Sequence, residues 1–231
     1  MERNAMRIFV GSFCIFAIVL LGGLSSWAHK YVANDGSHVD AAHALHIGDP
    51  GLSQVIYHPV TPATGQLWLT FNVFAGEEQY MQLGVPVLDR LDEYAPTLVL
   101  LGPGLPEIDT PLEVPEGLGG VVFPTAGLTA EFFDEHFTGT QSWILLEQDY
   151  PLLEEGQYYV VAYHPEGLEG KLWVAVGRRE EFGFKDLLTF REVVDDVREF
   201  HEVFDERPPL LTRILLAVSD ILRRLFFFML P

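Results

Sequence analysis

The stretch Gln66-Leu67-Trp68-Leu69-Thr70-Phe71-Asn72-Val73-Phe74 decides the fold. Apolar and other residues alternate along it, which is typical of a β-strand with one buried face. The face predicted to be buried carries Leu67, Leu69, Phe71 and Val73. Ala75-Gly76-Glu77 then gives a short turn, and residues 78–85 return as a second strand. The stretch therefore predicts a β-hairpin.

Further strands are predicted on both sides of this hairpin. They cover residues 54–58, 97–101, 120–123, 142–147, 157–164 and 171–176. Pro and Gly separate these short segments, and no helical pattern lies between them, which favours an antiparallel sandwich over alternating strands and helices. We expect a mainly β fold, a jelly-roll-like antiparallel β-sandwich of about eight strands, over residues 54–206. The Pro- and Gly-rich stretch 102–140 is predicted to be a functional loop or an insertion.

Three short stretches resemble the bacterial pre-peptidase C-terminal type of β-sandwich domain. They are LWLTFNVFAGE at 67–77, LVLLGPG at 98–104 and EGQYYVV at 155–161. The resemblance implies an exported, non-catalytic domain. The chain departs from the family pattern because acidic residues do not precede Trp68, stretch 102–140 is longer than expected, and no peptidase accompanies the domain. It resembles a stand-alone relative more than an appended module.

After Gly177 the apolar period changes from two to about 3.6, which predicts a helix over residues 189–204. Thr189 and Glu192 have the spacing of a capping box at its start. Pro208 and Pro209 are predicted to end it. We expect this helix to pack on the sandwich through its apolar stripe.

Residues 1–28 have the pattern of a signal peptide. Arg3 and Arg7 precede an apolar run over residues 8–24, and small residues stand at Ser26 and Ala28. We expect an exported protein, periplasmic or at the cell surface; a retained N-terminal membrane anchor is the alternative. Cys14 is the only cysteine of the chain and lies in this segment. The part after Ala28 can therefore form no disulfide and no thiolate site.

The charge of the chain excludes several classes of partner. Between residues 31 and 170 the only basic residue is Arg90, against 21 Asp and Glu. Such a surface repels phosphate backbones, so we expect no nucleic acid partner. A glycine-rich phosphate loop with lysine is missing, as is a Gly-x-Ser-x-Gly elbow, so we expect neither nucleotide binding nor serine hydrolase chemistry. The acidic surface fits calcium, cationic or sugar partners, or solvation alone.

Residues 29–53 are predicted to form a flexible arm that carries histidines. His43 and His46 are three residues apart and would share a face of a helical turn. If cleavage follows Ala28, the free amine and imidazole of His29 could hold copper(II) together. We expect no cofactor, with a copper or zinc site at His29, His43 and His46 as the alternative. Four other histidines are predicted to be hydrogen-bonding residues at the ends of strands or helices: His58, His136, His164 and His201.

The C-terminal segment 207–231 is predicted to be an amphipathic helix. At helical spacing its polar residues gather in one arc, and the rest of its surface is apolar. The predicted membrane-contacting residues are Arg213, Arg223, Arg224, Phe226, Phe227 and Phe228. This pattern fits a helix in the plane of a membrane surface. Packing on protein and a true membrane span are the alternatives.

The strand tryptophans allow two interpretations. Trp68, Trp143 and Trp173 could form a sugar-stacking face or belong to the core. Taken together, the sequence predicts a non-catalytic exported binding, adhesion or envelope-organising β-sandwich protein. Its partner would be an envelope protein or a glycan, and its C-terminal helix would associate with a membrane. The alternatives are an exported copper- or zinc-binding protein and a glycan-active enzyme that uses acidic residues of the long loop.

Overall fold

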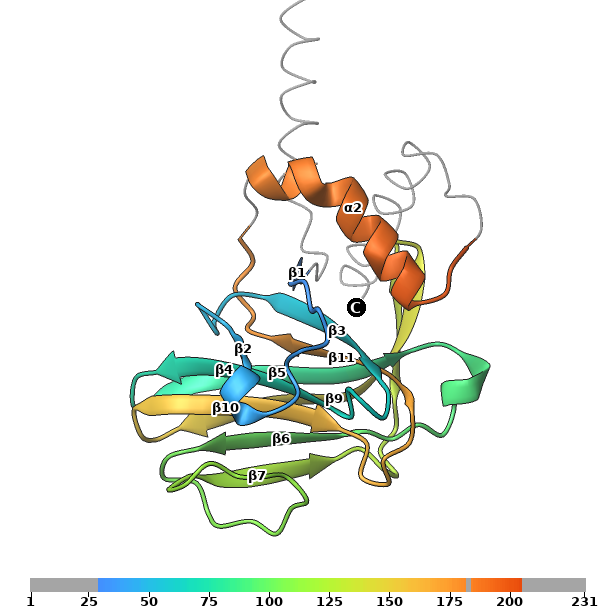
Figure 1. Cartoon of the computed structure of the whole chain (residues 1–231). Coiled ribbons are helices and arrows are strands. Elements are labelled where there is room, and N and C mark those ends of the chain that lie inside the picture. The colour runs from blue at the N-terminus through green and yellow to red at the C-terminus, as the bar shows by residue number, and fades with distance from the viewer. Residues whose placement is uncertain (1–28, 182–183, 205–231) are drawn as a thin grey trace, which may run out of the picture. The chain divides into compact units, whose positions relative to one another are not determined.

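The computed structural model describes residues 29–181 and 184–204, and this part of the chain forms two β-sheets packed face to face (Figure 1). The first sheet has six strands in the order β1-β3-β11-β5-β9-β8. Their bounds, in that order, are Lys30–Tyr31, Gln54–Val60, Gly170–Val176, Glu77–Pro86, Thr140–Leu152 and Glu131–Glu135. The second sheet has five strands in the order β2-β4-β10-β6-β7. Their bounds are Leu45–His46, Gln66–Val73, Gly156–Tyr163, Thr97–Gly102 and Gly119–Pro124.

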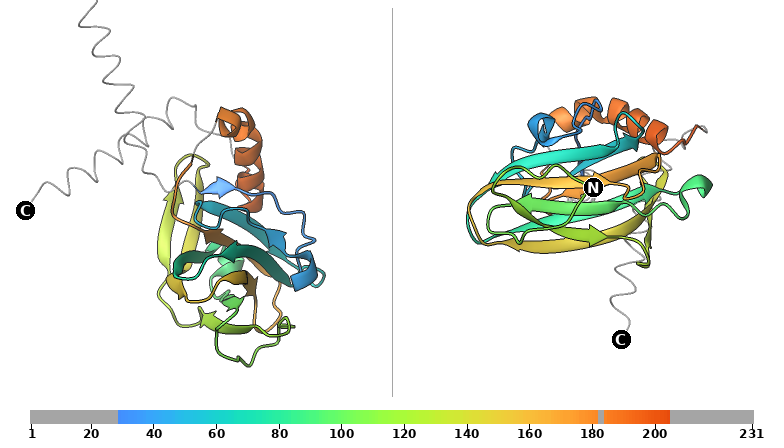
Figure 2. Two further views of the ribbon diagram at one scale, coloured as in Figure 1. Left: turned by 90° about the vertical axis from the view of Figure 1, so that its left-hand side faces the viewer. Right: turned by 60° about the horizontal axis from the view of Figure 1, so that its bottom comes forward.

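The predicted β-sandwich is therefore confirmed. β1 and β2 pair in parallel with β3 and β4, and the other neighbouring strands are antiparallel. Within the described residues, three helical segments join or follow the strands: η1 (Ala41–His43), η2 (Asp89–Leu91) and α2 (Phe184–Phe200). In both Figure 1 and Figure 2, α2 lies outside the six-stranded sheet.

Each of the eight predicted strands overlaps an observed one, and β1, β2 and β8 are additional. The segment 29–53, predicted as a flexible arm, supplies an edge strand to each sheet. The amide of Lys30 donates to the carbonyl of Ser53 at 2.8 Å, and the amide of Trp68 donates to the carbonyl of His38 at 2.9 Å. The edges of β3 and β4 offer backbone groups that need partners, and this segment provides them.

The main core lies between the two sheets. The residues that the alternation of β4 assigns to the buried face are all in it, and Leu69 and Phe71 have no exposed surface. From the other sheet, Leu83 and Val174 enter the same cluster. Hydrophobic burial between the sheets is the dominant stabilising contribution in such a fold.

The outer face of the five-stranded sheet is covered as well. Trp68 from β4 and Tyr159 from β10 are buried there, with ring centroids 5.8 Å apart. Leu112 is buried against them, from the connection 103–118 that precedes β7. Part of the long stretch 102–140 thus acts as a lid on this sheet, and the rest forms β7 and β8.

The bounds of α2 differ from the predicted helix. It begins at Phe184, so Thr189 is an internal residue and the predicted capping box is wrong. It ends at Phe200, before Pro208, because the chain turns there in a Schellman motif. In this motif the amide of Val203 donates to the carbonyl of Arg198 at 2.9 Å, and Glu202 has a positive φ of 60°.

Candidate functional site

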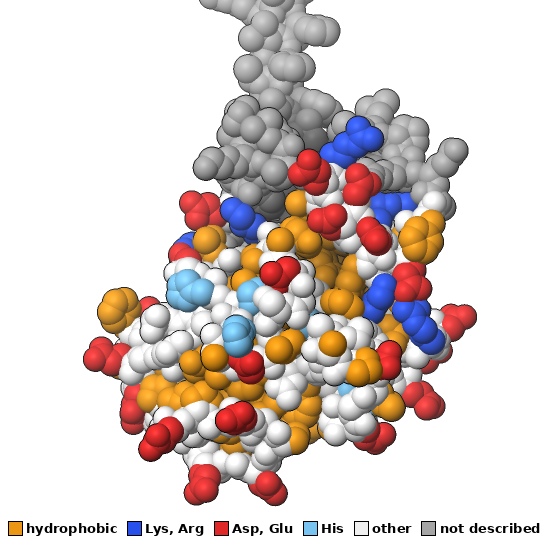
Figure 3. Space-filling view, in the orientation of Figure 1, with side chains coloured by type: hydrophobic (Ala, Val, Ile, Leu, Met, Phe, Trp, Pro, Cys, Tyr) orange, Lys and Arg blue, Asp and Glu red, His pale blue; other side chains and the backbone are white. Residues whose placement is uncertain are grey.

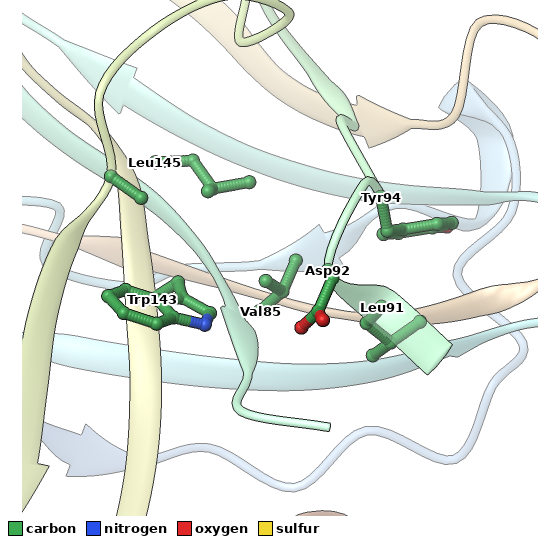
Figure 4. A pocket seen from close by; sticks show the side chains of 7 residues that line it. Val85, Leu91, Asp92, Tyr94, Trp143 and Leu145 are labelled. Atoms are coloured by element: carbon green, nitrogen blue, oxygen red, sulfur yellow. The ribbon is translucent and has the colours of Figure 1, made fainter. Parts of the chain in front are cut away.

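A small cavity opens at the edge of the sandwich between η2 and β9 (Figure 4). Its volume is about 140 Å³. Aliphatic walls come from Val85, Leu91, Ala130 and Leu145, and aromatic walls come from Tyr94 and Trp143. Asp92 is the only charged residue of the lining, and its side chain is exposed. Figure 4 shows the indole nitrogen of Trp143 on the side of the ring that faces the Asp92 carboxylate.

A β-bulge in β9 lies beside this cavity. Leu83 of β5 pairs with Leu146, whereas the next residue, Gly84, pairs with Ile144, so Leu145 is an extra residue in β9. Leu145 and Trp143 are two residues apart in β9, share a face of the strand, and both line the cavity. On the neighbouring edge strand, Phe132 pairs with Trp143 and packs edge-on against its indole at 5.3 Å between ring centroids. Phe132 remains 48 % exposed.

The chemistry of the cavity suits a small ligand with one apolar side. The carboxylate of Asp92 accepts hydrogen bonds, the indole N–H of Trp143 donates one, and the other walls are apolar. Pockets for larger ligands usually have about 300–1,000 Å³. This cavity can therefore hold about one ring.

A chain of buried hydrogen bonds joins α2 to the outer face of the six-stranded sheet. The indole N–H of Trp173 donates to Ser142 Oγ at 3.2 Å, and Ser142 Oγ lies 3.0 Å from Nε2 of His201. His201 Nδ1 lies 2.8 Å from the carbonyl oxygen of Val197. Because a carbonyl only accepts, the ring proton is on Nδ1, and Nε2 accepts from the Ser142 hydroxyl.

The Ser142–His201 pair resembles a nucleophile and its base, but its position assigns it a structural role. Ser142, His201 and Trp173 are 5 %, 4 % and 5 % exposed, so a substrate carbonyl has no path to Ser142 Oγ. Burial lowers the pKa of His201 to about 4, which keeps the ring neutral. Gly84 allows this arrangement, since a Cβ atom there would lie 2.2 Å from the Trp173 ring.

Charged residues fix the end of α2. Lys171 Nζ donates to the carbonyl of Phe200 at 2.6 Å and lies 2.9 Å from Glu202. Arg90 also binds the Glu202 carboxylate, at 2.9 Å. The hydrogen bonds from Arg90 and then Lys171 lower the pKa of Glu202 to about 2. Arg90, the single basic residue between positions 31 and 170, therefore serves the contact between η2 and the end of α2.

The three candidate metal ligands lie on different elements of the fold. His29 precedes β1 of the six-stranded sheet, and its Nδ1 is 2.7 Å from Ser53 Oγ. Burial lowers the pKa of His29. His43 ends η1, with its Nδ1 2.8 Å from Asp40, and His46 is in β2 of the five-stranded sheet. Within residues 29–181 and 184–204, no group of three His, Cys, Asp or Glu could hold a metal ion. Copper or zinc binding stays a prediction.

The structure gives the other histidines hydrogen-bond or ionic partners. His58 Nδ1 accepts from the Asn34 amide at 3.0 Å, and its Nε2 donates to the carbonyl of Thr64 at 2.8 Å. His164 Nδ1 accepts from the amide of Glu166 at 3.2 Å, and His136 lies 3.4 Å from Asp134. These contacts agree with the predicted hydrogen-bonding role.

Residues 135–140 form the turn that joins β8 to β9. The carboxylate of Glu135 accepts from the amide of Phe137 at 2.9 Å and from the hydroxyl of Thr138 at 3.0 Å. Gly139 closes the turn with a φ of 70°. The motif is therefore a capped hairpin turn.

The tryptophans separate into two groups. Trp68 and Trp173 are buried and belong to the core, so they cannot form a sugar-stacking face. Trp143 is half-buried and lines the cavity. Sequence reasoning identified Trp143 as a candidate but missed Asp92 and Phe132. No spacing in the sequence brings these two residues to the same edge.

Two groups of predicted residues lie outside the part of the chain that the structure describes. They are the signal peptide, 1–28, and the membrane-contacting residues Arg213, Arg223, Arg224, Phe226, Phe227 and Phe228. None of the helices in the described ranges has the length and apolar character that a membrane span requires.

The solved structures that are similar to this chain include two of low sequence identity. No family model and no curated protein matches the chain. The pre-peptidase C-terminal domain of a collagenase from Bacillus anthracis is 15 % identical, with 58 % of this chain and 93 % of that chain covered and a TM-score of 0.34. This domain is of the type that the three sequence stretches resemble. The secreted protein MopE of Methylococcus capsulatus, described as copper-binding, is 9 % identical, with 66 % and 99 % covered and a TM-score of 0.28. At these TM-scores neither likeness bears on what the chain binds.

Proposed function

We propose that the chain is an exported, non-catalytic binding domain that residues 207–231 hold at a membrane surface. The cavity between η2 and β9 is its binding site. The sequence motivates the export and the membrane contact, and the structure of the described domain supports the binding site.

One observation carries the proposal: the chain enters and leaves the domain on the same face. The hydroxyl of Tyr31 in β1 donates to the carboxylate of Asp196 in α2 at 3.2 Å. Tyr57 lies between them, with ring centroids 6.1 Å from Tyr31 and 4.9 Å from Phe200. The first described strand and the last described helix are thus neighbours. In sequence, the proposed membrane-contacting segment 207–231 follows shortly after this helix.

Electrostatics supports the C-terminal segment as the membrane contact. The described domain is acidic. In Figure 3, acidic side chains are spread over the visible face of this domain, whereas basic side chains gather in its upper part, near α2. An anionic membrane would repel such a body. The arginines at 213, 223 and 224 would instead attract anionic headgroups, each contributing about 1 kcal/mol near the surface.

The cavity favours a glycan over an envelope protein as the partner. A sugar hydroxyl can donate to Asp92 and accept from the indole N–H of Trp143, while the C–H side of the ring contacts Val85 and Leu145. A cavity of about 140 Å³ admits one terminal ring rather than a polymer.

Liposome pelleting tests the membrane part of the proposal. Residues 29–231 should pellet with anionic vesicles, and residues 29–206 should stay in the supernatant. The truncated chain keeps the compact unit His29–Asp205, so it should fold. A triple Arg→Gln variant at positions 213, 223 and 224 should lose most of the binding, and the matched triple Arg→Lys variant should keep it. Equal pelleting of the long and short chains would refute the tether.

A saccharide titration followed at the tryptophan indole N–H signals tests the binding site. We expect one terminal sugar to shift the Trp143 signal and leave those of Trp68 and Trp173 in place. Asp92→Asn should weaken binding about 10- to 100-fold, because a hydrogen bond to a charged group is lost. Asp89→Asn, at the exposed first residue of η2, the short helix that Asp92 follows, should leave it unchanged. If no saccharide shifts the Trp143 signal, a glycan is not the ligand.

A further inference from the structure

We propose that His201 is an acid-sensitive latch, whose protonation releases the end of α2 from β9 and loosens the β8–β9 hairpin. The latch goes beyond the proposed function, since it concerns the domain itself and does not require membrane binding. It rests on the hydrogen-bond chain through Ser142 and on the contacts that α2 makes with the hairpin.

The partners in this hydrogen-bond chain are compatible with only one ring proton on His201. Nδ1–H donates to Val197, Nε2 accepts from Ser142, and Ser142 Oγ accepts from Trp173. A second ring proton would be on Nε2, so that Nε2 and Trp173 Nε1 would both direct donors at Ser142 Oγ. The Ser142 hydroxyl would then lose its acceptor inside a buried site. Losing a partner in such a site is costly for the folded state.

The groups around His201 also oppose a positive charge. Lys171 of β11 is close enough to disfavour protonation, and Tyr57 of β3 packs edge-on at 5.5 Å between ring centroids. The neighbouring carboxylates have partners of their own: Glu202 binds Arg90 and Lys171, Asp196 of α2 binds Tyr31 of β1, and Glu135 of β8 caps the hairpin turn. The cation of Arg198, on α2, adjoins the same turn. Burial and Lys171 together hold the pKa of His201 well below its ordinary value.

Two contacts connect the latch to the β8–β9 hairpin. Arg198 Nη1 donates to the carbonyl of Thr138 in the turn at 2.8 Å, and His201 holds Ser142 near the start of β9. The residue after Ser142 is Trp143, which packs on Phe132 of β8 and lines the cavity. Release of α2 would therefore remove support from one wall of the cavity.

Hydrogen exchange of residues 29–231 between pH 7.5 and pH 4 tests the latch, with rates divided by the intrinsic exchange rate at each pH. Amides of residues 191–203 and 136–143 should lose protection as the pH falls below 6.5. The loss should approach tenfold per pH unit and level off near pH 4, because only the open state takes up a proton in that range. Amides of β4 and β10 should lose much less.

Two variants make the test specific. His201→Gln cannot gain a charge, so its protection of residues 191–203 should not change with pH beyond that of β4. His164→Gln changes a second buried histidine, which packs against Tyr94, and should behave like the native chain. A pH-dependent step that persists in His201→Gln, or its absence from the native chain, would overturn the proposal.

If the amides of α2 are unprotected at every pH in His201→Gln, this variant gives no pH comparison, and Lys171→Met tests the latch instead. Loss of the neighbouring cation should make protonation of His201 easier in the closed state, so the protection loss should level off at a higher pH than in the native chain. A purely structural role of His201 would leave this pH unchanged. The exchange experiment needs no lipid, so its outcome is separate from that of the liposome test.

Discussion

The layer between the two sheets and the layer beneath α2 are held by different means. The inner layer is a cluster of 21 buried residues, nearly all aliphatic or aromatic hydrocarbons. Among the side chains that the structure describes, the buried cluster beneath α2 is small. It consists of Val55, Trp173 and Ala175, with Tyr57, Ile144 and Phe200 packed against it and two hydrogen-bonded polar residues, Ser142 and His201, beside it. Hydrophobic burial is non-directional, whereas the hydrogen bonds of Ser142 and His201 require one geometry and one protonation state. The inner layer should therefore resist acid, and the layer beneath α2 should not.

The largest expected effect is in the inner layer. Phe71→Ala removes a fully buried ring and should lower the free energy of unfolding by about 3–5 kcal/mol. Urea denaturation measures it. The matched control is Phe74→Ala, three residues along the chain at a site that is 75 % exposed, where we expect a change within about 0.5 kcal/mol. Equal effects at the two sites would contradict the assignment of the inner face.

The next largest effect is the pH dependence of stability that His201, in the layer beneath α2, contributes. The pKa of His201 is about 4 in the folded chain and 6.5 in the unfolded chain. Between these values the unfolded chain binds a proton that the folded chain does not, so stability falls as the pH decreases and levels off below pH 4. The native chain should lose about 3 kcal/mol more than His201→Gln between pH 7 and pH 4. If the free energy of unfolding of the two chains falls equally with pH, protonation of His201 does not destabilise the folded state.

Ser142→Ala should have a smaller effect at neutral pH. It leaves the indole N–H of Trp173 and Nε2 of His201 without their partner, which should cost about 1–3 kcal/mol in urea denaturation. Ser37→Ala removes a hydroxyl that binds Asp35 at an exposed site and should change stability by less than about 0.5 kcal/mol. A neutral Ser142→Ala would mean that the hydrogen-bond chain does not hold α2.

The smallest effect concerns the residue that ends α2. Glu202 has a left-handed backbone, which glycine adopts without strain. Glu202→Ala loses the contacts with Arg90 and Lys171 and keeps the strain, whereas Glu202→Gly loses the same contacts but relieves it. Glu202→Gly should therefore be more stable than Glu202→Ala by about 1 kcal/mol in thermal unfolding. The reverse order would contradict the Schellman ending of α2.

The two layers also differ in how far the sequence predicts them. Alternation along β4 identifies Leu69 and Phe71 as inner residues, because a period of two assigns each residue to a face without knowledge of the partner strand. Alternation cannot tell that the opposite face is covered too. The burial of Trp68 depends on Leu112, which a distant loop supplies.

The contacts of α2 and of the cavity could not be predicted from the sequence, for a related reason. Ser142 and His201 are 59 residues apart, and their pairing depends on where α2 lies on the sheet. The end of α2 was predicted from Pro208, but Glu202 ends it earlier, since Arg90 and Lys171 stabilise a backbone conformation unusual for glutamate. Trp143 was recognised as an aromatic strand residue, whereas the presence of Asp92 at the same cavity depends on the position of η2, which no strand pattern predicts.

The most direct test of the contrast between the layers is the ring nitrogen spectrum of His201 at pH 5.5, with residues 29–231 labelled with ¹⁵N. The account predicts a neutral ring at this pH, with the proton on Nδ1 and none on Nε2, because Val197 accepts from the first nitrogen and Ser142 donates to the second. A ring protonated on both nitrogens in the folded chain at pH 5.5, or a neutral ring with its proton on Nε2, would contradict it.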